Sequence, residues 1–384
     1  MPDNPLLQLR EKGQSVWLDN IDRRMLTSGE LQRLVESGEV QGVTSNPTIF
    51  QKAISTCAEY DPSIRELAAA GADAYTIWEN LSIADIRAAA AILEPVYEAT
   101  DGRDGYVSIE VAPSLAHDVD GTIAEATRLF TTIARPNVMI KVPATQEGVR
   151  ATAELIGAGV NVNATLIFSP DNYEQIAHAY IAGLERLAER GAPVESVASV
   201  ASIFVSRIDT AVDRELEARL REATDARPQN LLRRLLGQAA IANCKVAYQR
   251  FRQVFSDARF VRLHKQGARV QRPLWASTST KNPAYRDVVY VEELIGPDTV
   301  NTMPPGTLAA FREHGRVRLS LEENVDHACR VLQDLAGLGI DMDRIYAELQ
   351  AAGVKAFADS LEELLNCIRE RAEALTVAEG GKGS

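Results

Sequence analysis

The feature that most constrains the fold is a repeated alternation. Short runs rich in β-branched residues alternate with longer Ala-, Leu-, Glu- and Arg-rich stretches of helical spacing. Strands that alternate with helices predict right-handed βαβ units and a parallel sheet. Eight such units favour an α/β fold of the closed (β/α)8 barrel type, with an open doubly wound sheet as the alternative. The expected strands are residues 15–20, 40–46, 106–111, 138–144, 160–168, 197–206, 272–278 and 299–304.

The remaining segments fit a single barrel domain over residues 1–375. No linker rich in Pro, Gly or Ser separates two independent cores. Residues 47–105 and 207–260 are expected to be helical insertions, and residues 320–375 are expected to form C-terminal helices that pack outside the barrel. The Gly-rich, polar tail over residues 376–384 is expected to be disordered.

Composition excludes several classes of protein. A net charge of −12 argues against general nucleic-acid binding, which requires a basic surface, but not against a small anionic ligand. The four cysteines form no CxxC pair and the five histidines form no HxxxH or HExxH motif, so neither a disulfide framework nor a histidine-built metal site is expected. No run reaches the ~18 apolar residues of a membrane helix, and no secretory signal is apparent, so we expect a cytoplasmic protein.

Lys141 is the most unusual residue of the expected strands. It lies in the otherwise apolar run VMIKVP. Burial disfavours the charged form of a lysine and lowers its pKa. A neutral amine at the carboxyl end of a barrel strand can attack a carbonyl to form a Schiff base. The alternative is a lysine that reaches solvent or pairs with a carboxylate, which is the more common situation for an isolated strand lysine.

Polar residues also lie late in the other strands, at the parity expected to face into the barrel. Each is costly in a core unless it is hydrogen-bonded or used, so several together favour a catalytic site over independent packing. A structural hydrogen-bond network is the alternative for any one of them. The residues are Asp19, Asn46, Glu110, Asn163, Thr165 and Ser202, and Phe204 shares the parity of Ser202.

Schiff-base chemistry suggests a role for each residue type. Loss of water from a carbinolamine requires a proton donor, for which Glu110 acting through water is the candidate. Cleavage of the adjacent C–C bond requires a base for a hydroxyl proton, and Asp19 is the candidate. The amides of Asn46 and Asn163 are suited to orient substrate hydroxyls, and Thr165 is suited to hold water.

Three residues after the sixth and seventh strands are candidates for binding a phosphate. Arg207 follows the sixth strand, and a guanidinium binds phosphate in a bidentate manner. Ser277 and Lys281 follow the seventh strand, where barrel enzymes often bind phosphate. The alternative for Arg207 is a surface ion pair with Asp209 or Asp213.

Seven segments together resemble the transaldolase family. They are WLDN, GVTSNPTIF, VSIEV, the MIKVPAT segment, VNVNATLIFS, SIFVSRID and LWASTSTKNP, and the resemblance runs from about Ser15 to Pro304. The resemblance implies a (β/α)8 barrel without cofactor or metal that transfers a dihydroxyacetone unit between sugar phosphates in the non-oxidative pentose phosphate pathway. Sedoheptulose 7-phosphate and glyceraldehyde 3-phosphate would give erythrose 4-phosphate and fructose 6-phosphate.

The resemblance also implies residue roles. Lys141 matches the Schiff-base lysine, Asp19 the acid/base and Glu110 the group that activates water. The other matches are Thr165 as the residue that positions the water, Asn46, Asn163 and Ser202 as hydroxyl ligands, and Arg207 and Ser277 as phosphate ligands.

The chain departs from the family at one matched position. Many members have an arginine where this chain has Ser279, and Lys281 is the candidate replacement. The chain resembles the longer bacterial subfamily, some members of which are fused to a phosphoglucose isomerase, and from its length we expect no such fusion here. The sequence predicts no oligomeric state.

Two other functions compete with transfer. A fructose 6-phosphate aldolase-like lyase would release dihydroxyacetone to water, but those shorter relatives have a phenol at the position of Phe204 and lack the glutamate matched by Glu110. A barrel that binds sugar phosphates without turnover would be expected to have lost Lys141 or a carboxylate.

Overall fold

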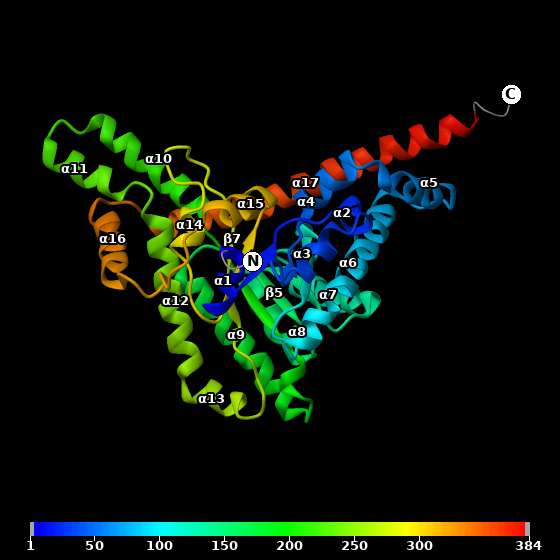
Figure 1. Cartoon of the computed structure of the whole chain (residues 1–384), viewed down its shortest axis with the longest axis horizontal. Coiled ribbons are helices and arrows are strands. Elements are labelled where there is room, and N and C mark those ends of the chain that lie inside the picture. Colours follow the sequence, from blue (N-terminus) through cyan, green and yellow to red (C-terminus); the bar gives the residue numbers. More distant parts are fainter. Residues whose placement is uncertain (1–3, 381–384) are drawn as a thin grey trace.

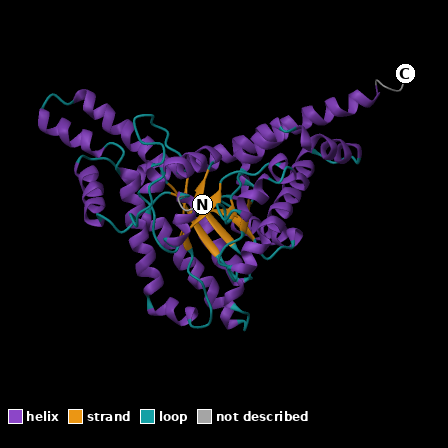
Figure 2. Cartoon of the chain, viewed as in Figure 1, coloured by secondary structure: helices purple, strands orange, loops and turns teal. Residues whose placement is uncertain are grey.

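A computed structural model describes residues 4–380, with side chains described for residues 4–375. Its parallel strands close into a barrel in chain order, which confirms the predicted (β/α)8 architecture (Figures 1 and 2). Each observed strand lies within its predicted range or begins one residue earlier. The strands are β1 (Gln14–Leu18), β2 (Gly42–Val43), β3 (Tyr106–Glu110), β4 (Val138–Pro143), β5 (Val162–Ile167), β6 (Ser199–Phe204), β7 (Arg272–Ala276) and β8 (Thr299–Met303).

Helices surround the barrel in Figure 2. Up to β6 they are α1 (Pro5–Glu11), α2 (Arg23–Thr27), α3 (Glu30–Glu36), α4 (Pro47–Thr56), α5 (Asp61–Ala69), α6 (Ala74–Ala99), α7 (Val119–Ile133), α8 (Gln146–Gly157) and α9 (Pro170–Glu189), with 3-10 turns at Ala58–Tyr60, Pro113–Leu115 and Val194–Ser196. After β6 follow α10 (Ser206–Glu222), α11 (Ala226–Leu235), α12 (Ala239–Ser256), α13 (Ala258–His264), α14 (Val289–Glu292), α15 (Pro305–His314), α16 (Val325–Gly337) and α17 (Met342–Gly380). The two predicted insertions are therefore helical.

Several strand-to-helix connections end in a side-chain cap. The side chains of Asn46, Asp118, Thr145 and Ser169 each accept a hydrogen bond from a backbone N–H in the first turn of the following helix. Such caps satisfy donors that have no partner within the helix. They fix where α4, α7, α8 and α9 leave the carboxyl ends of their strands, and therefore fix the loops around the barrel mouth.

The amino-terminal half of the barrel is closed by large and paired side chains. A Cβ on Gly42 would lie 2.5 Å from the Trp17 ring, so only glycine leaves room for this indole. Below it, Arg272 forms a buried ion pair of 3.0 Å with Asp104, which also accepts hydrogen bonds from Ser15 and from the Trp17 indole. Each of these polar side chains has a hydrogen-bond partner within the protein, so we infer that this end of the barrel has a structural role.

Strand register places three predicted site residues side by side. Glu110 on β3 pairs with Lys141 on β4, and Lys141 pairs with Asn163 on β5. The register shifts between β5 and β6 from Ala164 to Ile167, where Leu166 adopts a positive φ of 58°. This bulge ends the regular pairing beside the barrel mouth.

The prediction that the C-terminal helices pack outside the barrel did not specify which surface they cover, and α17 covers the barrel mouth. In Figure 1 this long red helix passes over the barrel and continues beside α4 and α5. Gln350 donates hydrogen bonds to the backbone carbonyls of Ala144 (3.0 Å) and Leu166 (3.1 Å). Ala144 directly follows β4, and Leu166 is the second-to-last residue of β5. The amphipathic pattern of a helix predicts that one face is buried, but it does not predict the surface against which that face packs. For α17 this surface is the barrel mouth.

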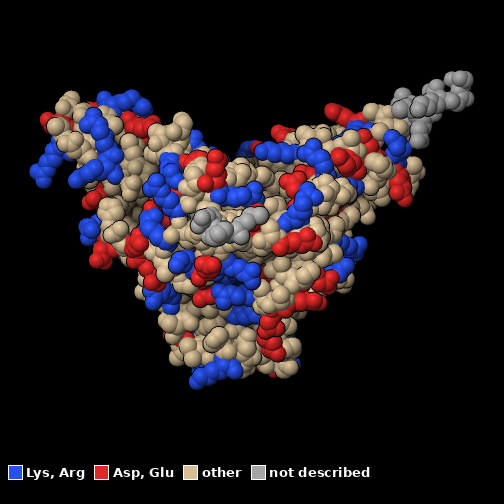
Figure 3. Space-filling view, viewed as in Figure 1, with Lys and Arg blue, Asp and Glu red and all other residues tan. Residues whose placement is uncertain are grey.

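The helix α17 extends to Gly380, and residues 381–384 of the tail expected to be disordered lie outside the described residues. No helix in the described part of the chain is both long and apolar enough to cross a membrane. On the face shown in Figure 3, basic and acidic side chains are interspersed rather than gathered into a basic stripe.

Candidate active site

A cavity of about 300 Å³ opens at the carboxyl ends of the barrel strands. Most of the residues predicted from the sequence line it, although they come from five different strands or the loops that follow them. They are Asp19, Asn46, Lys141, Ser202, Phe204, Arg207, Ser277 and Lys281. The remaining three, Glu110, Asn163 and Thr165, are buried directly behind this lining, inside the barrel.

Lys141 is at the base of the cavity and is only 4% exposed. Its Nζ donates a hydrogen bond to the backbone carbonyl of Ser45 (3.3 Å) and lies 3.8 Å from Oε2 of Glu110. The alternative of a lysine that reaches solvent is therefore wrong. The carboxylate neighbour of the other alternative is present, but it is a buried group beside a cavity rather than a surface partner.

Glu110 and Thr165 are buried, and their side-chain oxygens have no hydrogen-bond partner among the described residues. Burial raises the pKa of Glu110 to about 7, although the nearby Lys141 favours its ionised form. A carboxyl group with this pKa can both donate and accept a proton near neutral pH.

Asp19 lies at the end of β1, on the wall of the same cavity. Its Oδ1 accepts a hydrogen bond of 2.7 Å from the hydroxyl of Thr44, which also contacts the hydroxyl of Thr302 at 2.6 Å. Burial raises the pKa of Asp19, while Lys141 and the Thr44 hydrogen bond oppose the change. The carboxylate is thus a stronger base than an exposed aspartate.

The side-chain amides predicted to orient substrate hydroxyls already form some hydrogen bonds within the protein. The side-chain carbonyl of Asn46 caps α4 through Ile49 N–H (3.0 Å), which leaves its NH2 group at the cavity wall. Asn163 donates to the Ser108 hydroxyl (3.0 Å) and accepts from the Ser202 hydroxyl (2.7 Å). Asn163 therefore supports Ser202 from behind, and only Ser202 of this pair lines the cavity.

Arg207 lies over the ring of Phe204, with its Cζ atom 5.0 Å from the ring centroid. The expected alternative of an ion pair with Asp209 or Asp213 is wrong. Asp209 accepts hydrogen bonds from Ala240 N–H and the Tyr290 hydroxyl, and Asp213 from Gly237 N–H and the Tyr285 hydroxyl. No carboxylate among the described residues pairs with Arg207, and desolvation lowers its pKa. A cation in this situation favours an anionic ligand.

Further positive charge comes from the segment after β7. Lys281 donates a hydrogen bond of 2.6 Å to the Ser279 hydroxyl, so the serine that replaces the expected arginine holds the lysine in place. Burial and the charges of Arg207 and Lys52 lower the pKa of Lys281. Ser277, with a positive φ of 57°, presents its hydroxyl 3.0 Å from that of Ser206. Backbone strain of this kind is concentrated at functional sites.

The sequence interpretation missed several residues of this cavity. Thr44 shares the parity of Asn46 and could have been found by extending the strand argument, whereas Lys52 lies on the helix α4, six residues after Asn46, where strand parity does not apply. Phe357 could not have been found either, because it comes from α17 and its sequence context is that of an ordinary amphipathic helix. Its ring centroid lies 5.8 Å from Nζ of Lys141.

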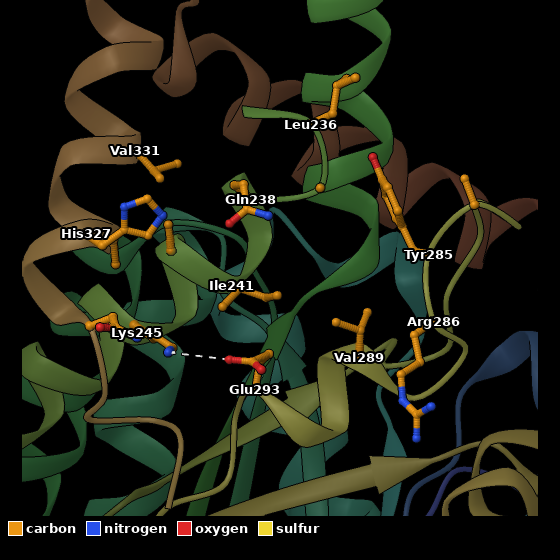
Figure 4. A pocket seen from close by; sticks show the side chains of 15 residues that line it. Leu236, Gln238, Ile241, Lys245, Tyr285, Arg286, Val289, Glu293, His327 and Val331 are labelled. Atoms are coloured by element: carbon orange, nitrogen blue, oxygen red, sulfur yellow. Dashed lines mark ion pairs between the residues drawn. The ribbon is translucent and has the colours of Figure 1, made fainter. Parts of the chain in front are cut away.

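A larger cavity of about 500 Å³ lies outside the barrel, between α12, α16 and the segment before α14 (Figure 4). Its cations are already paired: Lys245 lies 3.8 Å from Glu293, and Arg286 lies 2.9 Å from Glu292. Its other titratable side chains are Tyr285, which donates a hydrogen bond to Asp213, and the exposed His327. No buried titratable group of this lining lacks a partner among the described residues, so the smaller cavity at the barrel mouth is the candidate active site. Nowhere in the described residues do three His, Cys, Asp or Glu side chains form a group able to hold a metal ion.

Comparisons with known proteins identify the family to which the chain belongs. Residues 16–368 match the sequence profile of the family described as Transaldolase/Fructose-6-phosphate aldolase. A transaldolase of Trichodesmium erythraeum is 44% identical over 378 residues, which cover 98% of this chain and 100% of that protein. Transaldolase 2 of Nostoc punctiforme is 45% identical over 379 residues, covering 98% and 100%. A transaldolase of Saccharopolyspora erythraea is 45% identical over 364 residues, covering 94% and 96%.

These matches extend along almost the whole length of both this chain and the similar proteins, which confirms the resemblance inferred from the seven segments. The chain belongs to the transaldolase/fructose-6-phosphate aldolase family.

Proposed function

We propose that the protein transfers a dihydroxyacetone unit from sedoheptulose 7-phosphate to glyceraldehyde 3-phosphate through a Schiff base on Lys141. The products are erythrose 4-phosphate and fructose 6-phosphate, a step of the non-oxidative pentose phosphate pathway in the cytoplasm. The observation that carries the proposal is the position of Lys141: a buried amine 3.8 Å from Glu110 at the base of a cavity whose far wall holds Arg207 and Lys281.

The first step forms a C–N bond. The amine of Lys141 adds to the ketose carbonyl with loss of a proton from nitrogen, and the carbonyl oxygen takes a proton to give a carbinolamine. Loss of this hydroxyl as water leaves the iminium. Glu110 is suited to supply the proton through a water molecule, because its pKa is about 7 and its oxygens have no hydrogen-bond donor among the described residues.

The second step breaks a C–C bond. The breaking bond joins the carbon next to the iminium to a carbon that carries a hydroxyl group. Asp19 takes the proton of this hydroxyl, and the C–O group becomes the aldehyde of the leaving sugar. The electrons of the broken C–C bond move into the iminium to give an enamine. The raised pKa of Asp19 supports this role as a base, and the Thr44 hydroxyl orients it. Attack of the enamine on the acceptor aldehyde repeats these steps in reverse.

The phosphate end of the substrate is assigned to Arg207, Ser277 and Lys281. The guanidinium and the ammonium groups repel one another in the empty protein, and a phosphate dianion between them removes that repulsion. An open-chain sugar phosphate can then place its carbonyl at Lys141 while its phosphate lies at the cavity mouth.

Borohydride trapping tests the proposal. We expect fructose 6-phosphate and borohydride to add a dihydroxyacetone-derived or hexose-derived mass to the peptide that contains Lys141. The variant Lys141→Met should show no adduct. Lys245→Met, which changes a second buried lysine outside the site, is the matched control and should be labelled like the wild type.

An absence of adduct in the wild-type protein would favour a barrel that binds sugar phosphates without turnover. Rapid cleavage of fructose 6-phosphate without an acceptor aldehyde would favour the aldolase-like alternative. Production of sedoheptulose 7-phosphate from fructose 6-phosphate and erythrose 4-phosphate would support transfer.

A further inference from the structure

Phe357 of α17 covers the amine on which the proposed reaction depends. The residue lies more than two hundred positions after Lys141 in the chain, yet its ring centroid is 5.8 Å from Nζ of Lys141. The side chain is only 4% exposed and is part of the cavity lining. No other residue of α17 lines this cavity among the residues described. The helix thus contributes one apolar group to the site.

The position of this ring is fixed from both sides. Seven residues before it, Gln350 binds the carbonyl of Ala144, three residues after Lys141. Three residues after it, the Ser360 hydroxyl contacts that of Thr48 at 2.8 Å, and Thr48 also lines the cavity. Between Gln350 and the ring, a Cβ on Gly353 would lie 2.7 Å from Leu166, so glycine permits the close approach of the helix to β5.

The amine therefore has two different surroundings. Behind the lining are Glu110 and Thr165, whose buried oxygens have no hydrogen-bond partner among the described residues and suit a bound water. On the cavity side are the apolar rings of Phe357 and Phe204, which offer water no hydrogen bond. Water can therefore be held on the Glu110 side, whereas the Phe357 ring covers the amine on the cavity side with an apolar surface, even though much of the remaining lining, such as Asp19, Asn46 and Ser202, is polar.

We propose that Phe357 determines the specificity of the reaction for transfer over release by excluding bulk water from the enamine; this rests on the Schiff-base function proposed above. After the first aldose leaves, the enamine on Lys141 has two fates. Its nucleophilic carbon bonds to an acceptor aldehyde, whose oxygen takes a proton. Alternatively, that carbon takes a proton, water adds to the resulting C=N bond, and the amine of Lys141 leaves, which releases dihydroxyacetone.

The competing products measure this choice directly. The full-length enzyme is supplied with fructose 6-phosphate and erythrose 4-phosphate, and dihydroxyacetone and sedoheptulose 7-phosphate are quantified together. We expect Phe357→Ala to raise the ratio of dihydroxyacetone to sedoheptulose 7-phosphate about tenfold, because it opens the apolar side to water. Phe357→Leu, which keeps an apolar side chain of similar reach, should leave the ratio within about twofold of the wild-type value.

Leu364→Ala is the matched control, because Leu364 is fully buried on the same helix but does not line the cavity. It should leave the product ratio unchanged. An equal rise in Leu364→Ala and Phe357→Ala, or an unchanged ratio in Phe357→Ala, overturns the inference. If Phe357→Ala does not fold, the milder Phe357→Val should show a rise of about threefold, and an unchanged ratio there overturns the inference as well. A wild-type enzyme that makes no sedoheptulose 7-phosphate instead contradicts the proposed function.

Discussion

The residues of the candidate site fall into two groups, those whose polar atoms already form hydrogen bonds within the protein and those whose polar atoms do not. Asn163 and Ser202 are hydrogen-bonded to each other, and Asp19 is hydrogen-bonded to Thr44. Glu110 has no hydrogen bond, and Arg207 has no carboxylate partner among the described residues. A buried polar atom without a hydrogen bond costs stability, so a ligand or water can stabilise Glu110, whose charged neighbour Lys141 lies 3.8 Å away, and a phosphate can stabilise the half-buried Arg207.

Arg207 permits a test at the scale of one residue. We expect Arg207→Ala to raise KM for phosphorylated substrates by about 10- to 100-fold, because a charge-assisted hydrogen bond contributes about 1.5–3 kcal/mol. The measurement compares glyceraldehyde 3-phosphate with unphosphorylated glyceraldehyde as acceptor. KM for glyceraldehyde should be almost unchanged. Equal losses with both acceptors would remove Arg207 from the phosphate site.

At the scale of elements, the strands were predictable and the path of α17 was not. The runs around Lys141 and Asn163 are short, β-branched and bounded by turn residues, so each strand could be read from local sequence. Inward parity then singled out the polar residues that now lie around one cavity. Phe357 depends on which surface α17 covers, and that choice is made by distant contacts such as those of Gln350, which leave no local pattern.

The segment between β7 and α14 is a second element whose role follows only from the structure. It carries Ser277 and Lys281 into the site and is held at its far end by the hydroxyl of Tyr285, which donates a hydrogen bond of 2.7 Å to Asp213 on α10. Arg207 is the second residue of the same helix α10. This phenol–carboxylate contact, together with the contact between the Ser206 and Ser277 hydroxyls, therefore links the two sources of positive charge.

Tyr285→Phe should loosen this segment without changing the catalytic groups. We expect KM for phosphorylated substrates to rise about threefold to fivefold with kcat nearly constant, and the free energy of unfolding to fall by about 1 kcal/mol. Tyr248→Phe is the control, because the Tyr248 hydroxyl makes a single hydrogen bond to the carbonyl of Pro297, away from the segment. A similar change of KM in both variants would mean that the Tyr285 contact acts only through overall stability.

At the scale of the whole molecule, the two ends of the barrel serve opposite needs. The amino end pairs its buried charges fully, as in Arg272 with Asp104. The carboxyl end buries Glu110, which is 6% exposed, without a hydrogen bond. A fold can retain such a cost at one end because the rest of the core is well packed. The cost at Glu110 depends on pH, since burial penalises its ionised form.

The pH dependence of stability measures this cost. The pKa of Glu110 is raised from 4.5 to about 7 in the folded protein, so the folded state holds the proton more tightly than the unfolded chain. Stability from this group is fully present below pH 4.5 and is lost as the pH rises to about 7, by about 3 kcal/mol in all.

The variant Glu110→Gln cannot titrate at this position, so it should not lose this stability. Urea curves of the variant and the wild type give the free energy of unfolding of each. We expect the value of the variant minus that of the wild type to rise by this amount between pH 4.5 and 7.5. Other groups that titrate in this range, such as Asp209, are common to both proteins and cancel in the difference. A difference that stays constant across this range would mean that Glu110 ionises in the folded barrel as easily as in water, and its part as the proton donor would then lose its physical basis.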